Sequence, residues 1–372
     1  MISRRLFCGS VPAISLSLAT RSVLAQTSKP LALPSHGRYD YSSIKSRKPY
    51  RWPNGTSLAV YLALNLEHFA FGEGLGAELA PGGPQPDILN FAWRDYGNRV
   101  GVWRLFDLFD EIKWPASILV NTSIYAYCPE VMAAARAHRY DIVAHGRTNS
   151  ERQGTLDEAA EKQLISETTE IIAAAEGKPP KWLGPWISES RVTPDLLAEA
   201  GYSYLLDWGM DDQPIWFRTR GGNRILSVPY PQEVNDIPAI AARRNMGTQF
   251  SEMIVDQFDE MLAQSKSGPL VMGIALHPYL VGYPYRLREL RRALTTSTRA
   301  INGSGSPRPE RSRNTSPSCR PALYRAILSY FPAQNRCFFV SHGPKCYCSA
   351  TNSEAIGSGR WGQAAATTTH AK

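Results

Sequence analysis

The sequence predicts an α/β fold, a single barrel of alternating strands and helices followed by an irregular C-terminal tail. Two observations support this prediction. Residues 27–294 span 268 positions, close to the roughly 250 residues typical of one β/α barrel. Within them, short apolar runs of strand length alternate with segments whose apolar residues recur at helical spacing. Such alternation favours a mostly parallel sheet with both faces covered.

Local patterns mark the expected strands and helices along the chain. The apolar run at 58–65 predicts the first strand, and helical spacing over 100–112 predicts the helix after it. Thr155 and Glu158 have the spacing of a capping box, so we expect them to open a long helix that ends near residue 175. Thr193-Pro194 has the pattern of an N-cap followed by proline. We expect the other elements in this order: strand 116–121, helix 129–138, strands 140–144, 181–186, 202–206 and 225–228, helix 250–263 and strand 270–276.

The net charge of +8 belongs to the tail. Residues 295–372 hold ten basic and two acidic residues, whereas the first 294 residues are balanced. Binding of nucleic acid or of an anionic membrane requires basic residues on the folded body, so neither partner is expected, and a small-molecule or oligosaccharide substrate fits better. A polyanion binder acting through the run Arg308-x-x-Arg311-x-Arg313 is the competing hypothesis.

The N-terminus, residues 1–26, has the pattern of an export signal. Arg4-Arg5 precede a mostly small and apolar segment that ends in Val23-Leu24-Ala25, and the arginine pair resembles a twin-arginine signal. The apolar part is shorter than a bilayer span. We therefore expect a cleaved signal, no stable membrane anchor, and a periplasmic or secreted protein.

The tail, residues 295–372, does not continue the β/α rhythm. Its first 24 residues are rich in Thr, Ser, Gly and Arg with almost no apolar content, and such a composition cannot bury enough surface to order itself. We expect this low-complexity, basic tail to be disordered or to be encoded in a shifted reading frame. A shifted frame would leave the barrel open at one edge.

Polar residues follow several of the predicted strands. They are Glu67 and His68, His145, Trp186, Asp207 and His277. The active sites of β/α folds are built at the carboxyl ends of the strands, where loops bring distant segments together. Acid, base and ligand candidates at one end of the barrel therefore predict an active site.

Three segments resemble a known family. They are Trp52-Pro53-Asn54-Gly55, the run from Asp95 to Arg104, and His277-Pro278-Tyr279. In this order they are similar to the polysaccharide deacetylase (NodB-homology) superfamily over roughly residues 50–294, and look closest to the branch with metal-independent allantoinases. The resemblance implies a distorted β/α barrel and hydrolysis of non-peptide carbon–nitrogen bonds, including N-acetyl groups on sugars.

The resemblance also implies roles for individual residues. Glu67 matches the position of the catalytic base and His68 that of a metal ligand. His145 matches one of two metal-binding histidines, and Asn149 stands where the second is expected. His277 matches the motif of the catalytic acid. The family's arginine that orients the base is absent, because the corresponding loop reads Gly184-Pro185-Trp186.

Two mechanisms follow. In the first, a zinc-like divalent metal is held by His68 and His145 together with waters or Asn149, and it polarises the substrate carbonyl. Glu67 takes a proton from water and His277 protonates the leaving nitrogen. A neutral amide is a poor zinc ligand, so a metal-free reaction by the same base and acid is at least as well supported. It needs oxyanion donors such as Asn65, Asn149 or backbone amides.

The predicted function is a hydrolase that removes acetyl from an N-acetylated sugar or opens a small cyclic amide. Trp186, Trp208 and Tyr279 are expected to line the substrate site, with Asn65 beside them. The alternative is an exported binding protein that kept the fold and lost the chemistry. The two hypotheses differ in whether Glu67 and His277 lie within reach of one substrate atom.

Overall fold

The computed structural model describes residues 33–48, 50–52, 57–72, 76–81, 83–177, 181–303 and 338–340. The chain divides into two units, 1–36 and 37–372, and all the helices and strands that the structure describes belong to the second. The strands of its sheet are β1 (Leu58–Leu66), β2 (Ala116–Val120), β3 (Asp141–Ala144), β4 (Lys181–Trp182), β5 (Tyr204–Leu205), β6 (Ile215–Arg218), β7 (Arg224–Ser227), β8 (Leu270–Leu276) and β9 (Phe338–Val340).

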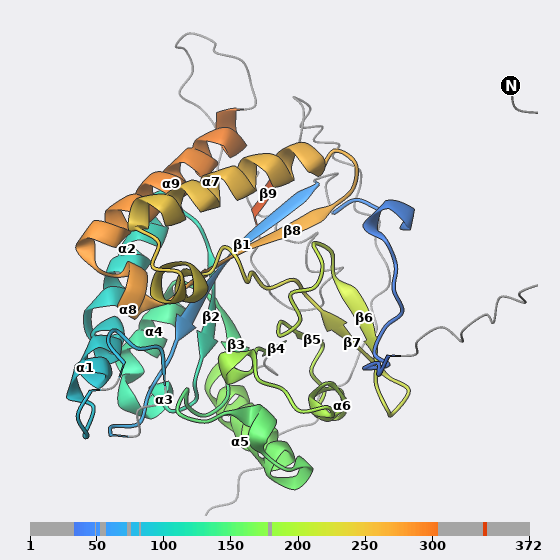
Figure 1. The fold of residues 1–372 in the computed structure, drawn as a ribbon, viewed down its shortest axis with the longest axis horizontal. Helices are drawn as coiled ribbons and strands as arrows, with labels where there is room; N and C mark the ends of the chain where they lie inside the picture. Colours follow the sequence, from blue (N-terminus) through green and yellow to red (C-terminus); the bar gives the residue numbers. More distant parts are fainter. Residues whose placement is uncertain are drawn as a thin grey trace, which may run out of the picture. The chain divides into compact units, whose positions relative to one another are not determined.

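The helices cover the outside of this sheet (Figure 1). The α-helices are α1 (Ile88–Tyr96), α2 (Val102–Ile112), α3 (Ile124–Tyr127), α4 (Pro129–Ala137), α5 (Glu158–Glu176), α6 (Thr193–Glu199), α7 (Gly247–Gln264), α8 (Pro278–Val281) and α9 (Pro284–Gly303). Two π-helical turns, η3 (Gly97–Gly101) and η6 (Ile237–Ala242), and the 3₁₀ turns η1 (Ile44–Ser46), η4 (Gln153–Thr155) and η5 (Pro185–Ile187) complete the set. Among the described helices, none is long and apolar enough to cross a membrane.

The sheet is a distorted β/α barrel, as the sequence predicts. Its strands lie in the order β6-β7-β5-β4-β3-β2-β1-β8. All neighbours in this order pair in parallel except β6 and β7. The edges β6 and β8 are connected through the segment before β6, because the Val271 amide donates to the Asp212 carbonyl at 2.8 Å.

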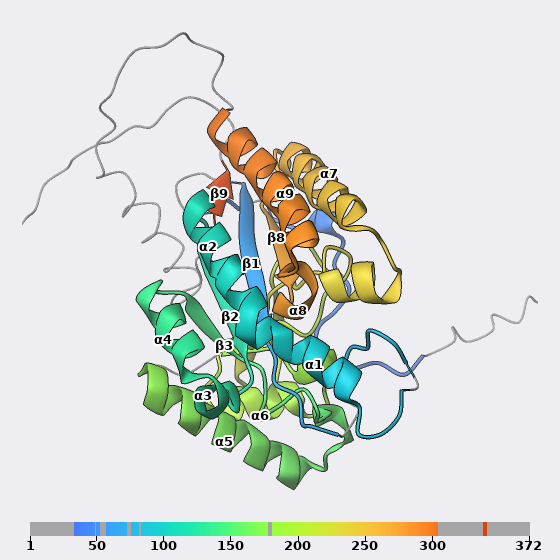
Figure 2. The ribbon, with the colours of Figure 1, turned by 90° about the vertical axis from the view of Figure 1, so that its left-hand side faces the viewer.

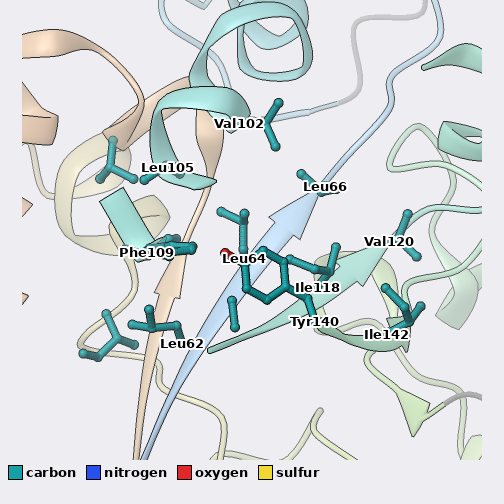
Figure 3. Close-up of a cluster of buried hydrophobic side chains, with 14 of the residues drawn as sticks. Leu62, Leu64, Leu66, Val102, Leu105, Phe109, Ile118, Val120, Tyr140 and Ile142 are labelled. Atoms are coloured by element: carbon teal, nitrogen blue, oxygen red, sulfur yellow. The ribbon is translucent and has the colours of Figure 1, made fainter. Parts of the chain in front are cut away.

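The two faces of β1 explain why its sequence is almost entirely apolar. Successive side chains of a strand point to opposite faces, and both faces of β1 are buried. Leu62, Leu64 and Leu66 pack against the surrounding helices, where they meet residues of α2 and of the neighbouring strands (Figure 3). Ala59 and Tyr61 point into the barrel instead. Glu67 directly follows β1. Like the odd-numbered residues of that strand, it faces the interior of the barrel.

Helices α7 and α9 lie side by side against the barrel in both views (Figures 1 and 2). In α9 the buried residues Leu287, Leu290 and Leu294 recur at helical spacing, while Arg288 and Arg292 keep most of their side chains exposed. This amphipathic pattern is what docks a surface helix. It also explains why the helix forms despite its strongly polar composition.

Two predicted helix starts are wrong. Helix α5 is capped by Asp157, whose carboxylate accepts from the Ala160 amide at 2.8 Å, because Thr155 lies in η4 and donates to the Arg152 carbonyl. Helix α6 includes Thr193 as its first residue. The Thr193 hydroxyl is directed to the buried carboxylate of Glu161 instead of capping the helix.

The end of the barrel also differs from the prediction. Helix α9, which is absent from the expected elements, runs past residue 294 to Gly303 and so enters the predicted tail. Strand β9, inside the predicted irregular tail, pairs antiparallel with Leu58–Val60 of β1. That edge of β1 is available because its pairing with β2 begins only at Leu62. The predicted export signal and the other tail residues lie outside the described residues, so those predictions stay untested.

Candidate active site

Glu67 stands at the centre of a buried polar cluster at the carboxyl end of β1. Its side chain is 6% exposed. Two side chains donate to its carboxylate: the Asn149 amide to Oε1 and the Tyr279 hydroxyl to Oε2, both at 2.6 Å. Two imidazoles face the same oxygen, with His277 Nε2 at 3.4 Å and His145 Nε2 at 3.6 Å from Oε1.

The surroundings of Glu67 keep it ionised. Burial by itself raises the pKa of this carboxyl, but His277 and His145 outweigh burial and hold the pKa well below its ordinary value. A hydrogen bond to an ionised group is shorter and stronger than one between neutral groups. The two short bonds from Asn149 and Tyr279 therefore fit a carboxylate that accepts and does not donate.

His277 follows β8 and is held by Asp236. Its backbone amide donates to Asp236 Oδ2 at 2.7 Å, and its Nδ1 lies 2.5 Å from Oδ1. Burial lowers the pKa of His277, but Asp236 and Glu67 raise it to about 10. At neutral pH the ring is therefore an imidazolium, and its Nε2 proton faces Glu67.

Asp236 is a residue of this cluster that the sequence analysis does not find. It is fully buried and lies directly before η6. It does not follow one of the predicted strands, so the rule that placed Glu67, His145 and His277 does not find it. Its only local mark is an acidic residue close before Pro238 at a helix start, a pattern common to ordinary N-caps.

His145 is oriented by the backbone of the next strand segment. Its Nδ1 lies 2.7 Å from the Leu183 carbonyl oxygen. Because a carbonyl only accepts, Nδ1 carries the hydrogen, and Nε2 is the atom turned toward Glu67. A backbone carbonyl that fixes one ring nitrogen and frees the other is the usual way to hold a working histidine.

Two further asparagines form hydrogen bonds that hold Glu67, His68 and Asn149 in place. Asn121 donates to Asn149 Oδ1 at 3.0 Å and accepts from the His68 amide at 2.8 Å. Asn98, inside the π-helical turn η3, donates to the Glu67 carbonyl at 2.8 Å. π-Helical turns occur mostly at functional sites, and here both described ones flank the cluster, η3 through Asn98 and η6 through Asp236.

No protein-family model matches this chain. A Schizosaccharomyces pombe protein named "Putative polysaccharide deacetylase" is 25% identical over 274 residues, which is 65% of this chain and 85% of that protein.

Solved structures give the same result. The crystal structure of a probable polysaccharide deacetylase from Pseudomonas aeruginosa PAO1 matches with a TM-score of 0.58 and 26% identity, covering 65% of this chain and 85% of its own. That of Puue allantoinase matches with a TM-score of 0.62 and 24% identity, covering 80% of this chain and all of its own. The resemblance to the polysaccharide deacetylase (NodB-homology) superfamily is confirmed.

In this deacetylase-like barrel, the expected metal ligand set does not assemble. The His68 ring stacks on Tyr127, with centroids 4.3 Å apart and planes 14° from parallel, beside an ion-paired Asp95. The Asn149 side-chain NH₂ donates to Glu67, and the Asn149 side-chain oxygen accepts from Asn121. Only His145 of the three faces the site. The described part of the chain holds no group of three His, Cys, Asp or Glu side chains arranged to hold a metal ion.

Two of the four expected substrate contacts, Tyr279 and Asn65, are fully buried and bonded within the barrel. Tyr279 is 2% exposed and donates to Glu67, so it positions the base and does not form an open floor. The Asn65 amide donates to the Tyr230 hydroxyl at 3.0 Å and to the Leu276 carbonyl at 3.3 Å. Both of its hydrogens are engaged, which leaves none for an oxyanion.

Trp208 lies in the wall of the barrel. Its indole donates to Glu189 at 2.7 Å, and its ring packs edge-on against Tyr39 and Phe217. The neighbouring Asp207 is buried and accepts from the Gly184 amide at 2.7 Å. Burial raises the pKa of Asp207 to about 7, and burial together with Asp207 raises the pKa of Glu189.

Trp186 lies beside the cluster. Its indole donates to the Asn149 carbonyl at 2.8 Å, and 38% of the residue is exposed. Trp186 and Ile187 have φ of 64° and 53°, a left-handed conformation that costs a residue with a β-carbon roughly 1–3 kcal/mol. Such strain concentrates at functional sites, and here it holds the ring next to the loop that binds Glu67.

Proposed function

We propose that this protein hydrolyses a non-peptide carbon–nitrogen bond, with Glu67 as general base and His277 as general acid. The substrate is an N-acetylated sugar or a small cyclic amide, as in the proteins it resembles. The observation that carries the proposal is the 3.4 Å separation between Glu67 Oε1 and His277 Nε2. One substrate atom can lie within reach of both groups, as an acid–base pair requires.

The base step uses the ionised carboxylate of Glu67. A water bound at Glu67 Oε1, the oxygen that His145 Nε2 faces at 3.6 Å, can donate a hydrogen to the carboxylate. As its oxygen attacks the carbonyl carbon of the substrate, Glu67 takes the proton that the new carbon–oxygen bond displaces. Asn149 and Tyr279 keep the carboxylate in place during the transfer.

The acid step uses the imidazolium of His277. When the carbon–nitrogen bond breaks, the leaving nitrogen takes the Nε2 proton and departs as a neutral amine. Asp236 stabilises the positive charge that the ring carries before transfer, as the buried aspartate of a catalytic triad does for its histidine. The proton held by Glu67 then returns to His277 and resets the site.

A zinc-like metal is not part of this mechanism, because the side chains expected to bind it are directed elsewhere. The ring of His68 is stacked on Tyr127, and the Asn149 amide donates to the carboxylate. The remaining residues, Glu67 and His277, support general acid–base catalysis.

The test is an amidase screen over N-acetylated sugars and cyclic ureides, with and without a chelator. We expect hydrolysis that a chelator leaves unchanged, and a loss of roughly 10²- to 10⁴-fold in kcat for Glu67→Gln. Glu199→Gln, an exposed glutamate paired with Arg220, is the matched control and should keep wild-type activity. Activity that survives Glu67→Gln would refute the proposed base.

The competing function is an exported binding protein without catalysis. It predicts that no substrate is turned over while sugars or ureides still bind, and that Glu67→Gln leaves their Kd unchanged. The short distance between base and acid favours catalysis over this alternative.

A further inference from the structure

A cavity of about 700 Å³ opens beside the catalytic cluster. Its size lies within the range of small-molecule sites. Most of its lining residues belong to the loop that follows β3: Arg147, Thr148, Ser150, Glu151, Arg152 and Thr155. Asn149, which donates to Glu67, lies within that same loop. The cavity and the proposed base therefore share one structural element.

The charged groups of this cavity are not equivalent. Arg147 is fully engaged, because it pairs with Glu151 at 2.5 Å and with Glu167 at 2.8 Å. Arg152 is exposed, and none of its side-chain atoms has a hydrogen-bond or ion-pair partner among the described residues. Of the two cavity arginines, Arg152 is therefore the one whose N–H groups are open to a ligand.

Trp186 fixes the position of the Arg152 guanidinium. The guanidinium of Arg152 lies over the Trp186 ring, 4.9 Å from its centroid. Trp186 is itself tied to the Asn149 carbonyl. Stacking uses the flat face of a guanidinium and leaves the N–H groups along its edge free to bind a planar anion such as a carboxylate in two-pronged fashion.

We propose that Arg152 and Trp186 form a carboxylate subsite, so that the substrate is an amide or ureide carrying one carboxylate away from the scissile bond. This inference rests on the proposed function and names the substrate class of the same site. A single guanidinium suits one carboxylate and not a polyanion. The balanced charge of the first 294 residues agrees with that choice.

The experiment compares matched substrate pairs that differ by one carboxylate: hydantoin against hydantoin-5-acetic acid, and N-acetylglucosamine against N-acetylmuramic acid. The first pair tests whether the carboxylated substrate is a ureide, and the second tests whether it is a sugar. We expect one carboxylated member to be preferred roughly 10- to 100-fold in kcat/KM, the size of one charge-assisted contact. Arg152→Gln should abolish the preference, and Arg152→Lys should restore part of it.

Arg136→Gln is the matched control, because Arg136 is an arginine paired with Glu176 on another part of the surface. It should keep the preference. Turnover in which the preference is absent, or survives Arg152→Gln, overturns the subsite and leaves the proposed function intact.

Calorimetric titration of both acids into Glu67→Gln and into the double variant with Arg152→Gln gives a second readout without turnover. Binding that weakens at least 10-fold in the double variant supports the subsite. Equal binding overturns it. Arg152-dependent binding with no hydrolysis by the wild-type protein would refute the proposed function alone.

Discussion

The pairing of His277 with Asp236 makes a prediction that needs no substrate. Asp236→Asn keeps the shape of the side chain and removes its negative charge. In the native protein Asp236 and Glu67 together raise the pKa of His277 from an ordinary 6.5 to about 10. This shift corresponds to roughly 5 kcal/mol favouring the imidazolium, at about 1.4 kcal/mol for each pKa unit.

The contribution of Asp236 to the pKa shift of His277 follows from the hydrogen bond between the two side chains. It accepts from Nδ1 at 2.5 Å inside a fully buried site, and a hydrogen bond to a charged group contributes about 1.5–3 kcal/mol. Losing the charge should therefore lower the pKa of His277 by roughly one to two units. Because the folded-state pKa is raised, His277 stabilises the fold fully below pH 6.5, and this contribution is lost as the pH rises toward 10.

The assay is an NMR titration of the imidazole nitrogens, with the His277 signals assigned from a His277→Gln spectrum. The wild-type ring should titrate near 10, and that of Asp236→Asn at a clearly lower pH. Asp110→Asn is the matched control, because Asp110 contacts His138 at 3.0 Å on the surface, and it should leave the His277 titration unchanged. A wild-type value near 6.5, or identical curves for wild type and Asp236→Asn, would refute the reasoning.

Two further predictions concern buried groups. Tyr279→Phe removes a hydroxyl donor from Glu67, so we expect the pKa of Glu67 to rise and kcat of the proposed reaction to fall roughly 10-fold; an unchanged kcat in steady-state assays would contradict the positioning role. Asp207 has a folded pKa of about 7, above its unfolded value of about 3.9, so stability is full below pH 4 and declines as the pH rises toward 7. Asp207→Asn should remove that decline in urea denaturation at pH 4.5 and 8, and a variant as pH-dependent as the wild type would count against the shift.

The sequence determined which strands carry the site, because each strand ends where its apolar run ends. Glu67, His145 and His277 each follow such a run, and the parallel sheet brings these ends together. Strand β8 matches its predicted bounds, Leu270–Leu276. Helix caps and the short strands β4 and β5 were less predictable, because their bounds depend on packing and not on local pattern.

What only the tertiary structure decided is the partner of each polar side chain. His68 and Glu67 are neighbours in the chain, yet a strand end turns successive side chains to opposite sides. The His68 ring therefore stacks on Tyr127, whereas the Glu67 side chain enters the barrel. Asp236 reaches His277 across 41 positions, a contact that no local spacing specifies. The sequence alone thus determined the barrel and the chemical types at its carboxyl end. Long-range packing decided which base meets which acid, because burial and hydrogen bonding act between segments that are distant in the chain.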